Sequence, residues 1–308
     1  MSDSTQLQLL TAAVAAAGIS PARILLPEDR YVRRNGIRFH YLDWGNAHLP
    51  HVVLLHGGSL QAHTWDPAAL LLRDHYHIVA LSQRGHGDSG WTADADLDKD
   101  GADLMLEDTR AFLEYLAYPR FALVGMSMGG INTMRYAARH QERLAAVGIV
   151  DVAPESMRDG QIEMESYRQE TESLATFDAF LERSQKFMPH RPVAHLRYSL
   201  THALKELPDG SWTWKQDHRR RGAPTSALER EARAAALWQD LQAIRAPTIL
   251  FRGEQSKILS AAIASKVIST MRDAREVVIP RATHNVHSDN PGDFAAALDR
   301  FLRPILLT

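Results

Sequence analysis

Short, unbroken apolar runs alternate along this chain with longer stretches of helical periodicity. The apolar runs are residues 52–55, 78–81, 121–124, 147–150, 248–251 and 277–279. Runs of this length are typical of strands that are buried on both faces of a parallel sheet. Helical patterns lie between several of them, at roughly 102–116, 128–140, 260–271 and 292–303. The alternation predicts an α/β fold with a mostly parallel open sheet and flanking helices.

The N-terminal part of the chain departs from this alternation. Residues 6–17 predict a short helix that ends at Gly18. Residues 31–34 and 37–41 flank Asn35-Gly36, which is the strongest short-range signal for a β-hairpin. We therefore expect an antiparallel hairpin ahead of the parallel strands.

A second departure is the interval between Asp151 and Pro247, which holds no convincing strand. It is rich in helix-forming residues, and the helical stretches are 174–187, 193–204 and 227–244. We predict a helical cap over residues 154–245, inserted between two strands of the sheet. The core then consists of residues 1–153 and 246–308.

The segment Gly125-Met126-Ser127-Met128-Gly129 joins an apolar run to a helix-forming stretch. A Gly-x-Ser-x-Gly between strand and helix is typical of the nucleophile elbow, a strained turn that presents the serine hydroxyl at the top of a parallel sheet. The glycines have a steric purpose, because side chains there would collide with the neighbouring strand and helix. We expect Ser127 to be a nucleophile. The alternative is a serine that only caps the helix.

A serine nucleophile needs oxyanion donors and a base. The amide of Met128 is expected to point into the oxyanion site from the helix N-terminus. His56-Gly57-Gly58-Ser59 directly follows the apolar run 52–55, where the oxyanion loop of such folds lies. We choose the amide of Gly58 as the second donor, with Ser59 as the alternative. A turn that merely ends the strand is also compatible with this segment.

The base is expected after the last predicted strand, where the chain reads Pro280-Arg281-Ala282-Thr283-His284. His284 has the right place in chain order, with the nucleophile first and the histidine last. His287 lies three residues further on and is the alternative base.

Together these motifs resemble the cap-bearing branch of the α/β-hydrolase superfamily, which includes meta-cleavage-product hydrolases, esterases and lactonases. The resemblance covers about residues 30 to 305. It is carried by four segments: His56-Gly57-Gly58, Gln83-Arg84-Gly85-His86-Gly87-Asp88-Ser89, residues 125–130, and His284 followed by Asp289-Asn290-Pro291. The second segment resembles a structural loop of the family, although Trp91 beyond it is a candidate for the pocket. The serine at the elbow argues against epoxide hydrolases and haloalkane dehalogenases, which resemble this chain elsewhere but use aspartate there.

The acid departs from the family's pattern. Family members usually carry an aspartate a few residues beyond the position of Gly253, whereas this chain has Ser256 and Lys257 there. We predict Asp151 as the acid, because it directly follows the apolar run 147–150 and the carboxyl ends of adjacent parallel strands line one crevice. The alternatives are Glu254, a Ser–His pair without an acid, and an Asp151 that only caps the turn into the cap.

Composition limits the partners and cofactors. A net charge of -2 favours neither nucleic acid nor an anionic membrane surface, and no segment approaches the ~20 apolar residues of a membrane span. The N-terminus lacks the basic region of a secretory signal, so a cytoplasmic protein is expected. The absence of cysteine excludes disulfides and thiolate metal sites. No metal or organic cofactor is expected, because no histidine–carboxylate cluster shows convincing ligand spacing along the sequence.

The leading hypothesis is a serine hydrolase that cleaves a small or medium ester, lactone or related carbonyl compound through an acyl-enzyme. Carbon–carbon bond hydrolysis of ring-cleavage products uses the same residues and is one alternative. A receptor-like, ligand-binding protein with little turnover is another, supported mainly by the missing acid. The expected partner is a small-molecule substrate, and the sequence leaves a homodimer open.

Overall fold

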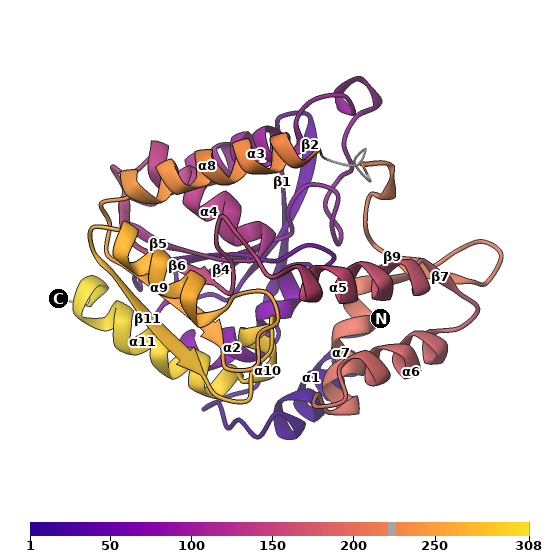
Figure 1. The fold of residues 1–308 in the computed structure, drawn as a ribbon. Coiled ribbons are helices and arrows are strands. Elements are labelled where there is room, and N and C mark those ends of the chain that lie inside the picture. The colour runs from indigo at the N-terminus through magenta and orange to yellow at the C-terminus, as the bar shows by residue number, and fades with distance from the viewer. Residues whose placement is uncertain (221–225, 308) are drawn as a thin grey trace.

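An eight-stranded sheet forms the centre of the protein, whose computed structural model describes residues 1–220 and 226–307 (Figure 1). In spatial order its strands are β1 (Glu28–Arg34), β2 (Ile37–Asp43), β4 (His77–Leu81), β3 (His51–Leu55), β5 (Phe121–Met126), β6 (Leu144–Val150), β10 (Thr248–Gly253) and β11 (Ala274–Ile279). The pairs β1–β2 and β2–β4 are antiparallel, and the remaining neighbours are parallel. The predicted α/β fold and N-terminal hairpin are confirmed.

The hairpin turn has a local cause. Asn35 and Gly36 have positive φ angles of 50° and 74°, which a two-residue turn between right-twisted strands requires. The turn sets Arg34 opposite Ile37 and fixes the register back to Glu28 opposite Asp43. Asp29 on β1 and His40 on β2 are thereby placed on neighbouring strands at the edge of the sheet.

Helices cover both faces of the sheet (Figure 1). The helices of the core are α1 (Asp3–Ala16), α2 (Asp66–Leu72), α3 (Gly101–Leu116), α4 (Met128–Arg139), α9 (Ala261–Thr270), α10 (Val286–Asp289) and α11 (Pro291–Leu306), with the 3₁₀ turns η1 (Ala62–Trp65) and η2 (Asp94–Asp96). Val52 and Leu54 pack on the α2 and α11 side, whereas Val53 and Leu55 pack against α3 on the other. The strand runs are unbroken because both faces are buried.

The N-terminal helix begins earlier than residues 6–17 predict. Ser2 accepts a hydrogen bond from the amide of Thr5 and so starts the helix at Asp3. It ends at Ala16, just before Gly18, whose φ is +68°. The helix packs against α7 (Val193–Ala203) of the predicted cap region.

The expectation that residues 151–247 hold no strand is wrong. A small antiparallel sheet lies there, formed in spatial order by β7 (Ser173–Leu174), β9 (Trp212–Trp214) and β8 (Leu204–Glu206). Strands of two or three residues are too short to show a period of two in the sequence. The accompanying helices and turn are α5 (Arg158–Glu170), α6 (Phe177–Phe187), α7, η3 (His218–Arg220) and α8 (Ala227–Ala243).

The boundaries of the cap stay a prediction, and residues 221–225 of its range and Thr308 of the core's lie outside the described residues. Within the range, α6 and α7 share an apolar cluster around Phe180 and Leu200. Helix α8 instead contributes Leu241 to a cluster with α4 and α9. A Cβ at Gly160 of α5 would lie 2.3 Å from the carbonyl oxygen of Lys257, so α5 packs directly on the loop after β10. None of the helices in residues 1–220 and 226–307 is long and apolar enough to cross a membrane.

Candidate active site

Ser127 lies in a tight turn between β5 and α4. Its backbone has φ 50° and ψ −115°, a conformation that L-residues rarely adopt and that marks a strained, functional turn. A Cβ at Gly125 would lie 2.2 Å from the carbonyl oxygen of Gly129, and one at Gly129 would lie 2.4 Å from that of Leu55. The turn therefore closes only with glycine at both positions. The side chain of Ser127 lines a large cavity.

Asp151 and His284 meet at the carboxyl ends of neighbouring strands. Asp151 follows β6, the neighbour of β5, and its amide donates to the carbonyl of Phe251 at 2.8 Å. His284 Nδ1 lies 2.8 Å from Asp151 Oδ2. The carboxylate is fully buried, and His284 lines the same cavity as Ser127. An ionised carboxylate can only accept, so Nδ1 carries the proton and Nε2 is left to take another.

Ser256 occupies part of the space where the family's usual acid is expected, and it supports Asp151. Its Oγ lies 2.5 Å from Asp151 Oδ2 and accepts from the amides of Ile258 and Leu259 at 3.1 Å each. With two donors on Oγ, the hydroxyl proton is directed to Asp151. The amide of Gly253 donates to the other carboxylate oxygen at 2.9 Å. Sequence reasoning missed this role of Ser256, although its place in the loop was the available signal.

Glu254, the alternative acid, faces away from this group. Its Oε2 accepts from the amide of Arg281 at 2.9 Å, and its side chain makes no hydrogen bond to His284 among the described residues. The carboxylate thus stabilises the turn that leads out of β11.

His287, the alternative base, lies in a different environment. Burial, together with the nearby charge of Arg191, lowers the pKa of His287 to about 3. Its ring stacks on Trp65 at 3.9 Å between centroids, and Nε2 lies 3.1 Å from the hydroxyl of Thr64. A histidine this hard to protonate is poorly suited to take a proton at neutral pH.

The loop that carries His284 is held by Asp289. The amide of Thr283 donates to Asp289 Oδ2 at 2.9 Å, and Arg191 from the cap region pairs with Oδ1. Burial alone would raise the pKa of the Asp289 carboxyl, but the charge of Arg191 and the hydrogen bonds from His190 and Thr283 hold it well below its usual range. A buried, ionised carboxylate therefore ties the cap region to the histidine loop.

The loop after β3 is held against the start of α4. His56 donates from Nδ1 to its neighbour's carbonyl, Gly57 O, at 2.7 Å and accepts at Nε2 from the amide of Gln83 at 2.9 Å. Its own carbonyl accepts from the amide of Gly129 at 3.1 Å. Burial lowers the pKa of His56 well below its ordinary value, so the ring is a neutral structural element.

The two chosen oxyanion donors face the cavity. Gly58 and Met128 both line it, and their amides donate no hydrogen bond to any acceptor in the described part of the chain. Ser59 lies beside them with a φ of 62° and also lines the cavity. Two amides without a partner that face the cavity suit a site that awaits a substrate oxygen.

The loop at residues 83–89 is anchored to α3 and also borders the cavity, which Arg84, Gly85 and His86 line. Arg84 makes two hydrogen bonds to Asp108, at 2.6 and 2.8 Å, with both side chains buried. Trp91 is outside the cavity lining and lies beneath Lys205 and Arg219, whose cationic groups are 4.7 and 5.3 Å from its ring centre. Trp91 as a pocket residue is therefore wrong.

The cavity has a volume of about 930 Å³ and an apolar lining rich in methionine. Its apolar side chains include Met105, Met126, Met128, Ile131, Met164, Phe187, Met188, Leu196, Leu200, Trp214 and Ile258. Phe187 and Trp214, which lie within residues 154–245, reach the cavity. Phe180 instead packs inside the cap region, and Trp238 donates to Glu155 at 2.9 Å.

Comparisons with known proteins identify the family and the fold. The family described as the alpha/beta hydrolase fold matches residues 50–291. An esterase of Mycobacterium tuberculosis, Rv0045c, is 30% identical over 291 residues, covering 92% of this chain and 90% of that protein. Its crystal structure superposes with a TM-score of 0.74 at 27% identity, over 98% of both chains. The crystal structure of an E-2-(acetamidomethylene)succinate hydrolase has a TM-score of 0.76 at 22% identity, over 90% of this chain and 99% of that one, and shares the fold.

Proposed function

The chain belongs to the alpha/beta hydrolase fold family and is a hydrolase, and from this premise we propose that it is a serine esterase for small or medium acyl esters. Ser127 is the nucleophile, His284 the base and Asp151 the acid that orients it. The amides of Gly58 and Met128 form the oxyanion hole. The observation that carries the proposal is the part-buried hydrogen bond between Asp151 and His284, beside the cavity that Ser127 lines.

The reaction follows from these positions. As Ser127 Oγ bonds to the ester carbonyl carbon, its proton passes to His284 Nε2, and Asp151 stabilises the imidazolium through Nδ1–H. The carbonyl oxygen becomes an oxyanion that the two amides receive; removing one such donor typically costs about a hundred- to a thousandfold in turnover. The carbon–oxygen bond to the leaving alcohol then breaks, and the alcohol takes the proton from His284. Water releases the acid from Ser127 by the same steps.

The size and lining of the cavity support the substrate class. A cavity of about 930 Å³ with mainly apolar walls suits an acyl chain of several carbons with few polar anchors. Unbranched methionine side chains fill space adaptably, so they favour a range of acyl groups over one rigid shape. The relative from Mycobacterium tuberculosis is itself named an esterase.

Replacing Ser127 by alanine tests the proposal with p-nitrophenyl butyrate as substrate. We expect turnover to fall by up to about a million-fold, because loss of the nucleophile disables the whole triad. Ser199→Ala, which alters another serine that lines the cavity, is the matched control and should keep near-normal activity. A fluorophosphonate should add its mass to Ser127 alone. Labelling at another serine, or an active Ser127→Ala variant, would contradict the assignment.

Two alternatives have their own outcomes. The receptor-like hypothesis depends on a missing acid, and the contact between Asp151 and His284 removes that support. Carbon–carbon bond hydrolysis uses the same residues, so a dienoic ketone is included beside the esters. If the enzyme turns over that ketone much faster than every ester, the assigned activity becomes carbon–carbon bond hydrolysis in place of ester hydrolysis.

A further inference from the structure

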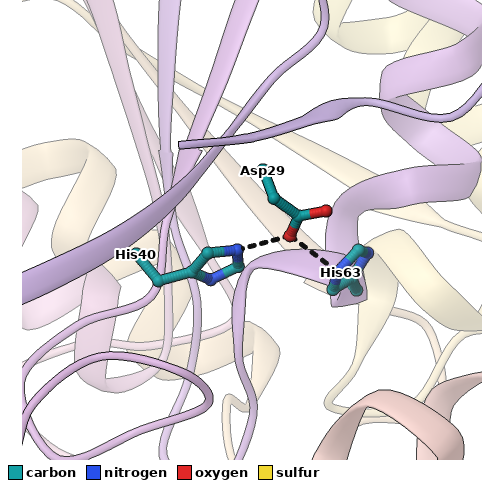
Figure 2. Close-up of side chains that lie close together, drawn as sticks. All are labelled: Asp29, His40 and His63. Carbon is teal, nitrogen blue, oxygen red and sulfur yellow. Dashed lines mark hydrogen bonds and ion pairs between the residues drawn. The ribbon is translucent and has the colours of Figure 1, made fainter. Parts of the chain in front are cut away.

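A second group of histidine and carboxylate side chains lies at the edge of the sheet, away from the cavity lining. Asp29 of β1, His40 of β2 and His63 of η1 converge there (Figure 2). In the described ranges they are the one set of three such residues whose ligand atoms all lie within 4.8 Å of one another. Asp29 Oδ1 is 2.7 Å from His40 Nε2 and 4.0 Å from His63 Nε2. Two imidazole nitrogens therefore face a single carboxylate oxygen.

His63 is held from behind in the manner of a metal-binding histidine. Its Nδ1 lies 2.7 Å from Oδ2 of Asp66, a fully buried carboxylate that also accepts from the hydroxyl of Tyr198. The carboxylate can only accept, so Nδ1 carries a proton and Nε2 presents its lone pair towards Asp29. A carboxylate behind a metal-ligating histidine fixes its tautomer and orientation and raises its basicity.

His40 is held in a similar way by a hydroxyl. Its Nδ1 lies 3.0 Å from Ser82 Oγ, which also accepts from the amide of Ala62 at 3.2 Å. In the structure without an ion, Nε2–H donates to Asp29 and Nδ1 accepts from the Ser82 hydroxyl. A hydroxyl can also accept, so Ser82 permits the tautomer in which the proton moves to Nδ1 and a cation takes its place at Nε2. Both imidazole rings are buried, whereas the side chain of Asp29 is 48% exposed. The carboxylate thus opens the group to ions from water.

The charges around the group favour a cation. Asp29 brings a carboxylate to the group, and its Oδ1 lies 2.7 Å from His40 Nε2. Asp66 lies behind His63. The nearby ammonium of Lys215 is already paired with both oxygens of Asp88, at 2.9 and 3.1 Å.

A third histidine adjoins the group. The ring of His202, on α7, stacks on that of His63 with 3.7 Å between centroids. His202 Nε2 is buried and has no hydrogen-bond partner within the described residues. An unpartnered buried nitrogen next to two converging ligands calls for an explanation.

We propose that Asp29, His40 and His63 bind a divalent transition metal ion of the zinc class. Two imidazole nitrogens and one carboxylate oxygen suit such ions, which leaves a further position for water. Ligand atoms of a tetrahedral zinc ion lie about 3.4 Å apart, from bonds of about 2.1 Å. The pairs at 2.7 and 4.0 Å bracket this spacing, so a shift of under about 1 Å by the exposed Asp29 admits the ion.

The ion links the β1–β2 hairpin to the segment beside the oxyanion loop. Gln61 and Thr64 line the cavity, and His63 lies between them in the chain. A ligand that binds the folded protein alone stabilises it by mass action, so the occupied protein should melt at a higher temperature.

Equilibrium dialysis of tag-free, chelator-treated protein against Zn²⁺ tests the site. We expect one ion per chain, a raised melting temperature, and visible d–d absorption when Co²⁺ replaces Zn²⁺. Asp29→Asn and His63→Gln should each weaken Zn²⁺ binding at least tenfold. Asp178→Asn, a matched change in an exposed carboxylate of α6 outside the group, should leave Zn²⁺ binding unchanged.

Folding of each variant is checked by its melting curve without metal, and Asp29→Asn carries the test because this side chain is half exposed. Three results would overturn the site: no Zn²⁺ bound by the unaltered protein, equal affinity in Asp29→Asn, or binding that is lost in His284→Gln but kept in Asp29→Asn. The last result would place the ion at the active site.

Discussion

Two assemblies of histidine and carboxylate in this molecule use the same residue types in different geometries. At the cavity, a single imidazole ring is hydrogen-bonded to a single carboxylate. Asp151 accepts hydrogen bonds from His284, Ser256 and the amide of Gly253. At the sheet edge, two rings converge on one oxygen of Asp29. An imidazole ring whose Nδ1 is held by a carboxylate and whose Nε2 faces a cavity can take up and return a proton. Two rings directed at one point, each held from behind, can bind an ion.

The difference arises from the strands that carry each assembly. Asp151 and His284 follow parallel strands, whose carboxyl ends meet at one edge, and the loops there line the cavity. Asp29 and His40 lie within the antiparallel β1–β2 hairpin, and η1 brings His63 against them. The first assembly is therefore open to a substrate, while the second is confined between structural elements.

The largest expected effect is a loss of kcat in Asp151→Asn that Glu254→Gln does not share. Asp151→Asn should lower kcat for p-nitrophenyl butyrate by up to about ten-thousandfold, because the amide cannot hold His284 in the required tautomer. Glu254→Gln, the matched control on the adjacent loop, should keep activity within about twofold, since its carboxylate accepts only from a backbone amide. Zn²⁺ binding by Asp151→Asn should equal that of the unaltered protein. An active Asp151→Asn with an inactive Glu254→Gln would move the acid to the neighbouring strand.

A smaller effect is expected from the serine that supports the acid. Ser256→Ala removes one of three donors to Asp151 and should lower kcat about tenfold, in line with about 1.5 kcal/mol for a hydrogen bond to a charged group. Ser256→Thr keeps the hydroxyl and should restore most of the activity. A rise in KM with kcat unchanged would show that Ser256 shapes the cavity and does not support the acid.

Local signals made much of the first assembly predictable. The elbow needs its glycines within five residues, and buried strands are unbroken apolar runs, so Ser127 and the strand that precedes it could be inferred from the sequence. Asp151 is predictable as the acid from its place directly after a predicted strand, because the carboxyl ends of adjacent parallel strands line one crevice. The hydroxyl proton of Ser256 could not be inferred, because its direction depends on the amides of Ile258 and Leu259.

The second assembly has no such local signal. Asp29, His40 and His63 come from two strands and a 3₁₀ turn, and their sequence separations match no ligand pattern. Their meeting depends on the hairpin register and on the packing of η1, which are tertiary facts. The small sheet of β7, β8 and β9 was missed for a related reason, because its short strands depend on one another for their structure.

The smallest expected effect concerns a histidine that belongs to neither assembly. Among the described residues, the ring of His287 makes no hydrogen bond to a carboxylate. Its Nε2 contacts the hydroxyl of Thr64 and the ring stacks on Trp65, and burial, together with the charge of Arg191, lowers its pKa to about 3. As the pH falls below about 6.5, the unfolded chain binds a proton at this residue that the folded chain does not, and stability therefore decreases towards acid pH. His287→Gln should make this loss shallower by up to about 1 kcal/mol per pH unit between pH 6.5 and 5. Urea denaturation at both pH values measures the slope, and an unchanged slope would mean that His287 gains a proton without unfolding. In that case, the absence of a carboxylate beside His287 would not explain why its ring differs in protonation from the rings beside Asp151 and Asp29.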